Sequence, residues 1–219
     1  MSSYPIIKLL HAQSTEAEIQ RSVEVLNDAF QGDRFSAVLL GGDLSLSSLQ
    51  LAANIRAAII GGEVHVLSVG PAVEDIVGVA IWYPPGTSGF ASEEERDAGW
   101  NQFLDVIPSS LKDWWLKYFI PKMQELSINS LGAGYQHNSW HLHIFGVAKA
   151  HHRKGYGKAL FKYAEEKARA TKSPMVLETT NDVDVRLSFP NDLRKANINP
   201  GDHIFKAGVH RPRGDDPPE

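Results

Sequence analysis

A turn that combines glycines with basic residues lies between a predicted strand and a predicted helix. Residues 140–147 form an apolar run, a helical pattern begins near Gly155, and the segment 148–158 between them reads AKAHHRKGYGK. Glycine lets backbone N–H groups approach an anion without interference from a Cβ atom. A helix N-terminus adds unpaired donors and a partial positive charge. A strand, this turn and a helix therefore predict a seat for a pyrophosphate and suggest a nucleotide-type cofactor.

Apolar periodicity predicts the other elements. Strands are expected at 6–10, 63–69, 75–83, 140–147 and 175–179, and helices at 15–30, 44–60, 92–126 and 155–170. The Gly-Pro turn after residue 69 favours a hairpin of the second and third strands. An antiparallel beginning followed by a strand–helix–strand end predicts an α/β fold of the α+β type, with a mixed sheet.

The helical segment 92–126 is rich in aromatic residues. Pro108 divides it, and we expect Pro121 to kink or stop the second helix. Aromatic residues at helical spacing usually face a core. However, Trp114, Trp115 and Tyr118 are too crowded for all three to be buried, so we expect one of them to line a pocket.

Composition argues against several classes of protein. The chain has 22 basic and 26 acidic residues and a net charge of −4, so no overall basic field attracts nucleic acid. It has no cysteine, which excludes disulfides, thiolate metal sites and a cysteine nucleophile. No signal-peptide pattern and no apolar run of about 20 residues is evident. We therefore expect a soluble, intracellular (cytoplasmic) protein that does not bind membranes and is a monomer or a homodimer.

The turn and its flanks resemble the GNAT superfamily of N-acetyltransferases. The family motif has Gln or Arg, two residues, Gly, one residue and then Gly or Ala, just after the fourth strand. Here residues 152–157 read HRKGYG, and Val147 matches the valine that closes that strand. Two positions differ, because His152 replaces the Gln or Arg and Lys149 stands where the family usually has proline. The resemblance extends over residues 6–187.

This resemblance implies a mixed, mostly antiparallel central sheet flanked by helices, with splayed fourth and fifth strands. It also implies that acetyl-CoA binds between those two strands. The implied contacts to the pantetheine arm come from the backbone of Phe145, Gly146 and Val147 and from Asn181. The implied contacts to the pyrophosphate come from His152, Arg153, Lys154, Gly155, Tyr156, Gly157 and Lys158.

The C-terminal segment departs from the family pattern. Many members continue with Leu-Tyr and then Gly-Phe, and the tyrosine acts as a general acid; here Leu187 is followed by Ser188, and Pro190 would interrupt the expected helix. We therefore expect a GNAT-like domain over residues 1–187, with the helical insert at 92–126, and an atypical, partly disordered tail over 188–219. Within the tail, only 203–209 is a strand candidate. Loss of the last two family strands would leave the edge of the fifth strand unpaired.

The resemblance implies acetyl transfer from acetyl-CoA to a primary amine of a small molecule or peptide. We expect direct attack, because no cysteine is present to carry a covalent intermediate. For the proton transfers, His141 and His143 lie on one strand face at i, i+2, Glu178 lies on the next strand, and Ser188 stands in the tyrosine position. Free histidine has a pKa of about 6.5, which suits a general base. The predicted catalytic residues are His143, Glu178 and Ser188, with oxyanion donors from amides near Gly146 and Val147.

Two other interpretations remain open. Ser188 and the unmatched tail also fit a coenzyme A-binding protein with little or no turnover. The pairs His141-x-His143 and His151-His152 resemble a histidine-rich metal site. No acidic residue at a recognisable spacing completes a ligand set, so we predict no metal.

Overall fold

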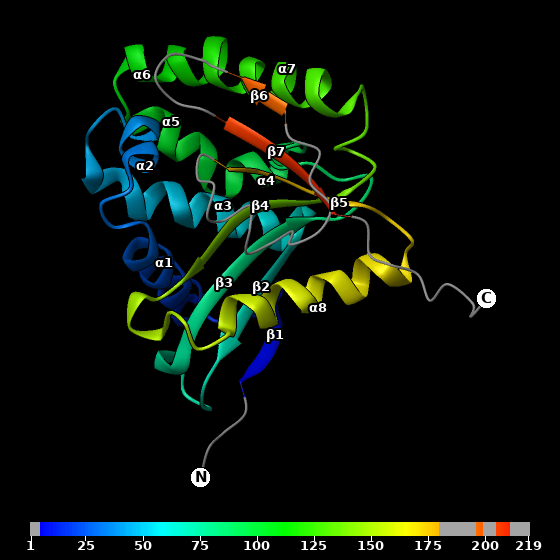
Figure 1. Cartoon of the computed structure of the whole chain (residues 1–219). Helices are drawn as coiled ribbons and strands as arrows, with labels where there is room; N and C mark the ends of the chain where they lie inside the picture. The colour runs from blue at the N-terminus through cyan, green and yellow to red at the C-terminus, as the bar shows by residue number, and fades with distance from the viewer. Residues whose placement is uncertain (1–4, 180–195, 199–204, 211–219) are drawn as a thin grey trace, which may run out of the picture.

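The computed structural model describes residues 5–179, 196–198 and 205–210. Its centre is a mixed sheet with strand order β1-β2-β3-β4-β5-β7-β6 (Figure 1). The strands are β1 (Ile6–Leu10), β2 (Glu63–Ser68), β3 (Ile76–Tyr83), β4 (Trp140–Val147), β5 (Met175–Thr179), β6 (Ala196–Ile198) and β7 (Phe205–His210). Every neighbouring pair is antiparallel except β4 and β5, which are parallel. The predicted α/β class with a mostly antiparallel sheet is confirmed.

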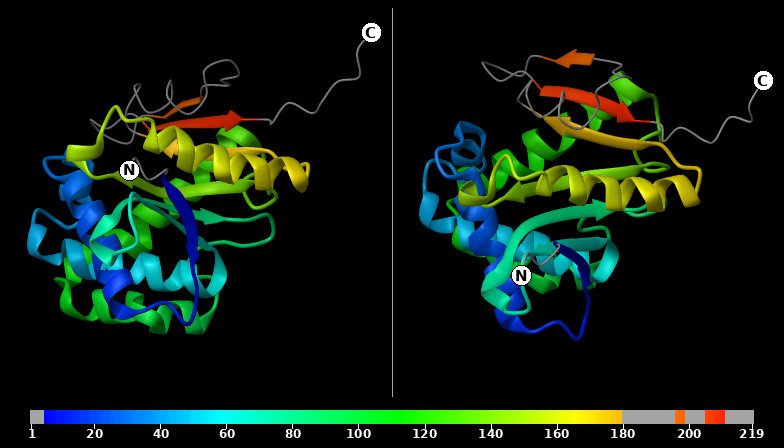
Figure 2. Two further views of the ribbon diagram at one scale, coloured as in Figure 1. Left: turned by 90° about the horizontal axis from the view of Figure 1, so that it is seen from below. Right: turned by 60° about the horizontal axis from the view of Figure 1, so that its bottom comes forward.

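Helices flank both faces of the sheet (Figure 2). The longer ones are α1 (Glu16–Phe30), α3 (Ser47–Gly61), α7 (Ile120–Leu131) and α8 (Tyr156–Ala170); shorter helices are α2 (Arg34–Leu39), α4 (Glu93–Glu95), α5 (Asn101–Val106) and α6 (Ser109–Trp114). Single helical turns are η1 (Leu44–Leu46), η2 (Val73–Asp75), η3 (Arg96–Trp100), η4 (Trp115–Phe119) and η5 (Lys149–His151). Thr15 caps α1 and forms a reciprocal capping box with Glu18.

Two apolar layers hold these helices on opposite faces of the sheet. On one face, Leu26 of α1 and Ile55 of α3 are fully buried in one cluster with Ile81 of β3. On the other face, Leu160 of α8 is fully buried in a second cluster with Met175 of β5. Because successive strand residues point to opposite faces, the central strands β2, β3 and β4 contribute to both layers and are held from both sides.

The helical insert builds a third apolar cluster against α2. Trp115 is only 6% exposed, and its indole N–H donates to the carbonyl oxygen of Leu39 at 2.9 Å. Tyr118 is 44% exposed, so the three crowded aromatic residues are not all buried. The helix does not stop at Pro121, because α7 continues to Leu131, so that part of the prediction is wrong. The turn directly before Pro121, η4, is a π-helix within a continuous helical stretch from Ser109. Such a turn is an irregularity of the kind that accompanies a proline inside a helix, and the kink stays a prediction.

Strand β4 separates from β5 part-way along its length. The two strands pair only from Trp140 opposite Met175 to Leu142 opposite Leu177. The register with β3 also shifts at this point, because Trp82 lies opposite Leu142 and the preceding Ile81 lies opposite Ile144. His143 is thus an extra residue in a β-bulge, a feature that redirects side chains. Beyond Leu142, β4 has β3 as its one strand neighbour among the described residues, as expected for splayed strands.

The expectation of an unpaired fifth strand is wrong. Strand β7 pairs with β5 from Met175 opposite His210 to Thr179 opposite Lys206, and β6 continues the sheet beside α7 (Figure 1). The predicted strand at 203–209 corresponds to β7. Backbone N–H and C=O groups do not depend on the side chains, so a tail without the family's usual sequence still completes the edge. The domain boundary at 187 stays a prediction.

The segment Leu44–Gly61 is long and apolar enough to cross a membrane by composition alone, and it is 44% buried. In the fold it is a core helix. α3 packs against α1 and the sheet, and it buries the polar residues Gln50 and Asn54 along with its apolar ones. A polar residue is buried when its hydrogen bonds are made inside the protein, so these two positions distinguish α3 from a lipid-facing helix.

Candidate active site

The turn between β4 and α8 presents backbone donors to solvent. Gly155, the N-cap of α8, has the left-handed conformation φ 82°, ψ 2°, and Arg153 also has a positive φ of 59°. No side chain caps the helix. The N–H groups of Tyr156, Gly157 and Lys158 have no acceptor among the described residues, since the first bond of the helix joins Ala159 to Gly155. Such a helix start attracts anions.

Three exposed cations surround these donors. Arg153, Lys154 and Lys158 are exposed and form no ion pair within the described part of the chain. Lys149 is different, because its ammonium donates to the carbonyl oxygen of Gln31 at 2.9 Å and its N–H donates to Asp28 Oδ2 at 2.6 Å. Lys149 therefore anchors the turn to α1, while the other three cations remain available to an anion.

The two glycines of the motif serve different purposes. A Cβ at Gly155 would meet no atom within 4 Å, so its positive φ is the constraint. A Cβ at Gly157 would lie 3.3 Å from Cζ of Phe145. The absence of a side chain at Gly157 therefore allows the first turn of α8 to approach β4 closely.

The free edge of β4 directs alternate backbone groups into the gap beside β5. The N–H of Ala148 donates to the carbonyl oxygen of Val77 on β3 at 2.8 Å. Because backbone groups of an antiparallel strand alternate in direction and the register is regular here, Gly146 also points its N–H toward β3. Phe145 and Val147 point theirs into the gap. The register therefore favours Phe145 and Val147, rather than Gly146, as donors to a ligand between the strands.

Two histidines and a glutamate meet where β4 and β5 separate. His141 Nε2 lies 2.7 Å from Glu178 Oε2 and 3.0 Å from Nε2 of Gln136. The rings of His141 and His143 are 5.9 Å apart between centroids. The parallel pairing of His141 with Val176 places the following Glu178 beside them. Of the predicted catalytic residues, the structure brings His143 and Glu178 close to each other. Each of them contacts His141 of β4.

His143 is exposed to solvent, and protein groups also contact its ring. Its Nε2 is 2.8 Å from Oδ1 of Asn54 on α3, and Tyr83 contacts the ring edge-to-face at 5.5 Å. The pKa of His143 is lowered to about 4, chiefly because its surroundings disfavour the charged ring; the charge of His141 acts in the same direction and Glu178 opposes it. His143 is therefore neutral at physiological pH and has a lone pair to accept a proton.

Glu178 is ionised in this arrangement. Its side chain is 10% exposed, and burial raises its pKa, but the charge and hydrogen bond of His141, with a further contribution from His143, lower the pKa overall. An ionised carboxylate orients the imidazole to which it is bonded and stabilises that ring when it gains a proton. The site can thus accept a proton and stabilise the resulting positive charge with the carboxylate of Glu178.

Comparisons with known proteins agree with this geometry. The model of the acetyltransferase (GNAT) family matches residues 113–188, which include β4, the glycine turn, α8 and β5. The chain has a GNAT acetyltransferase fold. The resemblance inferred from the sequence is therefore confirmed. No curated protein sequence matches the chain.

Solved structures match the GNAT fold over almost the whole chain. One, a histone acetyltransferase HPA2 and related acetyltransferase from Corynebacterium glutamicum, is 19% identical, covers 98% of each chain and gives a TM-score of 0.58. Arylalkylamine N-acetyltransferase 2 from Aedes aegypti is 16% identical, covers 95% of this chain and 99% of its own, and also gives 0.58. PH1933 from Pyrococcus horikoshii is 16% identical, with 95% and 98% covered and a TM-score of 0.56. At these identities the match concerns the fold alone.

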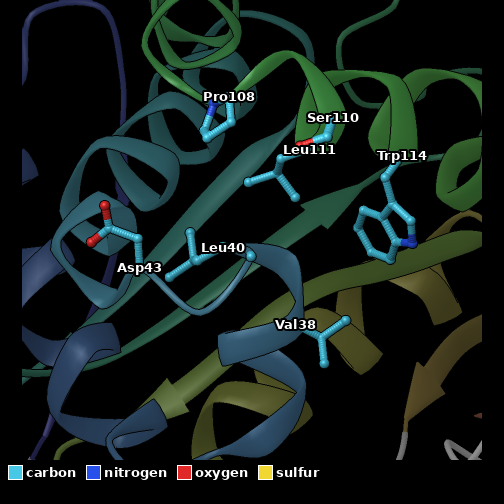
Figure 3. Close-up of a pocket in the computed structure, with 8 residues that line it drawn as sticks. Val38, Leu40, Asp43, Pro108, Ser110, Leu111 and Trp114 are labelled. Carbon is cyan, nitrogen blue, oxygen red and sulfur yellow. The ribbon is translucent and has the colours of Figure 1, made fainter.

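The helical insert of this GNAT domain contributes to a surface pocket of about 340 Å³ (Figure 3). The pocket lies between α2 with the following loop on one side and α6 on the other. Its lining is mostly apolar: Val38, Leu40, Gly41, Asp43, Pro108, Ser110, Leu111 and Trp114. Trp114 is therefore the crowded aromatic residue that lines a pocket, as the sequence predicted for one of the three.

The histidines of the GNAT domain do not gather into a metal site in the described part of the chain, where no group of three or more His, Cys, Asp or Glu side chains has suitable geometry. His151 and His152 belong to the glycine turn. His151 stacks on Tyr156 at 6.0 Å, and His152 Nε2 donates to the carbonyl oxygen of Val147 at 2.8 Å. The second histidine pair therefore supports the turn.

Two of the predicted site residues, Asn181 and Ser188, lie outside the described residues. Conversely, no sequence pattern was used to predict Asn54 and Gln136, which contact the histidines. Asn54 had a recognisable signal, because it is a polar residue on the apolar side of its helix, between Ala53 and Ile55. Gln136 lies in the loop before β4 and has no such signal.

Proposed function

We propose that this GNAT domain binds acetyl-CoA and transfers the acetyl group directly to a primary amine of a small molecule or peptide. One observation carries the proposal: the gap between β4 and β5 has an anion-binding turn at one end and a histidine–glutamate group at the other. A ligand with a pyrophosphate at one end and a thioester at the other needs two such unlike sites along one gap. The family match over residues 113–188 supports acetyl transfer in general, and these residues support the cofactor.

The residues present fit coenzyme A. Three unpartnered amides at the start of α8 and the cations Arg153, Lys154 and Lys158 suit a pyrophosphate. The outward amides of Phe145 and Val147 suit an arm that binds as an added strand. Acetyl-CoA would supply the activated acetyl group. The protein would hold that group beside β4, polarise its carbonyl with an outward amide, and accept the amine's proton at the histidines.

The proposed roles follow from position. His143 is the general base, because it is neutral and open to the gap. Glu178, which is bonded to His141, adds a nearby negative charge that favours a proton on His143. Ser188 remains a proposed aid to the leaving thiol and Asn181 a proposed pantetheine contact. We also propose a cytoplasmic location and a monomer or homodimer that binds neither nucleic acid nor membranes, in line with the net charge of −4.

Binding is tested with matched glycine variants. Gly155→Ala places a side chain at φ 82° in the turn, and Gly86→Ala imposes the same strain at φ 86° in the loop after β3; neither Cβ meets another atom within 4 Å. We expect acetyl-CoA to raise the melting temperature of wild type and Gly86→Ala, and to have little effect on Gly155→Ala. Equal shifts in both variants would contradict the pyrophosphate seat.

Catalysis is tested separately by the release of free thiol from acetyl-CoA with a panel of primary amines. Thiol release that depends on the amine supports an N-acetyltransferase. Stabilisation by acetyl-CoA without thiol release for any amine would favour the alternative, a coenzyme A-binding protein with little or no turnover. A protein stabilised by zinc and not by coenzyme A would exclude both.

A further inference from the structure

Asn54 of α3 contacts the proposed base from the face of the sheet that carries α1 and α3. Asn54 is 2% exposed and makes two hydrogen bonds: its Nδ2 donates to the carbonyl oxygen of Gln50 at 2.8 Å, and its Oδ1 lies 2.8 Å from Nε2 of His143. Neither the family match nor the motif assigns a role to this residue.

The bond to Gln50 determines which way the Asn54 amide faces. A carbonyl oxygen only accepts hydrogen bonds, so the group that faces it must be the NH₂. The reverse orientation would place two oxygens against each other inside the helix. The NH₂ therefore faces Gln50, and Oδ1 faces His143.

The orientation of the amide in turn determines where His143 carries its hydrogen. Oδ1 also only accepts, so Nε2 of His143 must be the donor. A neutral imidazole has one N–H and one lone pair, and the lone pair is then on Nδ1. Nδ1 has no hydrogen-bond partner among the described residues, and the His143 side chain is exposed to solvent.

We infer that Asn54 is a positioning residue that holds neutral His143 as the Nε2–H tautomer, and that Nδ1 is the atom that accepts the proton from the acceptor amine. The tautomer follows from the hydrogen bonds alone, whereas the role of Nδ1 rests on the proposed function. In the step, the neutral amine attacks the acyl carbon, and Nδ1 takes one of its two protons as the C–N bond forms. The other proton stays on the amide nitrogen. When the C–S bond breaks, the thiolate takes up the proton that Nδ1 accepted, so that His143 is neutral again.

The alternation of β4 places His143 on the face that carries α3. Trp140 and Leu142 face α8, so His141 and His143 face the other way, with their rings side by side. The bulge follows His143, because Ile144 lies on the same face as His143. Without Asn54, Nε2 would have no acceptor among the described residues, and both neutral tautomers would be populated.

The tautomer is tested on the wild-type protein by NMR, without any assay of activity. Long-range ¹H–¹⁵N correlation of the His143 ring at pH 7.5 is expected to show Nε2 as a protonated, pyrrole-type nitrogen and Nδ1 as an unprotonated, pyridine-type nitrogen. The opposite assignment would overturn the inference and leave the proposed function intact, because His143 would still carry a lone pair.

The function of the tautomer is tested with Asn54→Leu and a matched control. Asn27→Leu removes an amide that also makes two hydrogen bonds, to Ser47 and Ser48, but does not contact a histidine. We expect Asn54→Leu to give mixed tautomer signals and to lower kcat by about 10- to 100-fold with little change in KM, since general-base catalysis contributes about 10²- to 10⁴-fold. Asn27→Leu should keep both the signals and kcat.

Three outcomes separate the two levels of the inference. Mixed tautomers with an unchanged kcat in Asn54→Leu would overturn the assignment of Nδ1 as the proton acceptor. A wild-type tautomer retained in Asn54→Leu would overturn the positioning role of Asn54. An unchanged kcat in His143→Ala would overturn the proposed base itself, whatever the tautomer.

Discussion

The imidazole of His152 lies 2.8 Å from the carbonyl oxygen of Val147, and this bond connects the glycine turn to the free edge of β4. A carbonyl cannot donate, so Nε2 of His152 is the donor. His152 occupies the position where the family motif usually has Gln or Arg. All three side chains carry N–H donors, so the histidine can make the same kind of contact.

The effect of replacing His152 on the affinity for coenzyme A should therefore depend on whether the new side chain can donate a hydrogen bond. His152→Gln should bind coenzyme A as wild type does. His152→Leu should bind several-fold more weakly, because a typical hydrogen bond contributes about 1 kcal/mol. Isothermal titration of both variants with coenzyme A checks this, with His11→Leu, after β1, as a control. Tighter binding by His152→Leu would indicate that His152 competes with the ligand for the carbonyl.

Two His–Glu pairs with the same 2.7 Å contact provide a matched experiment at the active site. Glu178 bonds to His141 beside the gap, whereas Glu63 bonds to His65, and also to Lys167 of α8, on the opposite face. Glu178→Gln should lower kcat about tenfold, because the charge that stabilises a protonated histidine is lost. Glu63→Gln should leave kcat unchanged and lower the free energy of unfolding. Equal losses of kcat would show that the effect of Glu178 is structural.

The histidines make the folded state sensitive to acid. Burial lowers the pKa of His65, with Glu63 opposing it, and the pKa of His143 is lowered to about 4. In the unfolded chain both histidines have a pKa of about 6.5. At a pH between the folded-state and unfolded-state pKa values, the unfolded state therefore binds more protons than the folded state. The stabilising contribution of the two histidines is complete above about pH 6.5 and is lost as pH falls toward their folded-state pKa values.

Urea unfolding of wild type and His143→Asn at several pH values between 7 and 5 measures this effect. The free energy of unfolding of wild type should decrease as the pH falls, and His143→Asn should show a shallower decrease, with the remainder due in part to His65. Identical slopes would mean that His143 has an ordinary pKa in the fold.

The insert depends on one buried hydrogen bond as well as on apolar packing. Trp115→Phe should lower the free energy of unfolding by about 1 to 3 kcal/mol, because it leaves the carbonyl oxygen of Leu39 without its donor. Trp114→Phe is the control, since the indole N–H of Trp114 has no acceptor within the described residues and its ring still stacks on Phe119. Chemical denaturation of both variants is the measurement; a larger loss for Trp114→Phe would contradict the assignment.

Much of the fold was predictable from local patterns. The strands at 140–147 and 175–179 and the helix that begins after Gly155 follow from periodicity and turn residues, which act over a few positions. The anion-binding turn was predictable for the same reason. A stop at Pro121 was wrongly expected, because the sequence pattern does not reveal the π-helical turn that precedes the proline and lets the helix continue.

The strand that pairs with the edge of β5 was not expected from the resemblance to the family. The unfamiliar tail suggested an open edge, yet β7 pairs along β5. Sheet pairing uses backbone groups that every residue except proline can offer in full, so a changed sequence need not change the partner.

Most of the helices and strands, their order, and the positions of the histidine, glycine and carboxylate groups on them could be read from residue type and short-range spacing. The long-range contacts could not: the bulge after His143, the bond between Glu178 and His141, and the contact of an asparagine 89 positions before His143 with its ring became visible in the fold alone. Those contacts arise when a parallel crossover and a packed helix bring distant segments together. Their geometry is set by the complementary packing of side chains across the sheet, which no local pattern in the chain specifies.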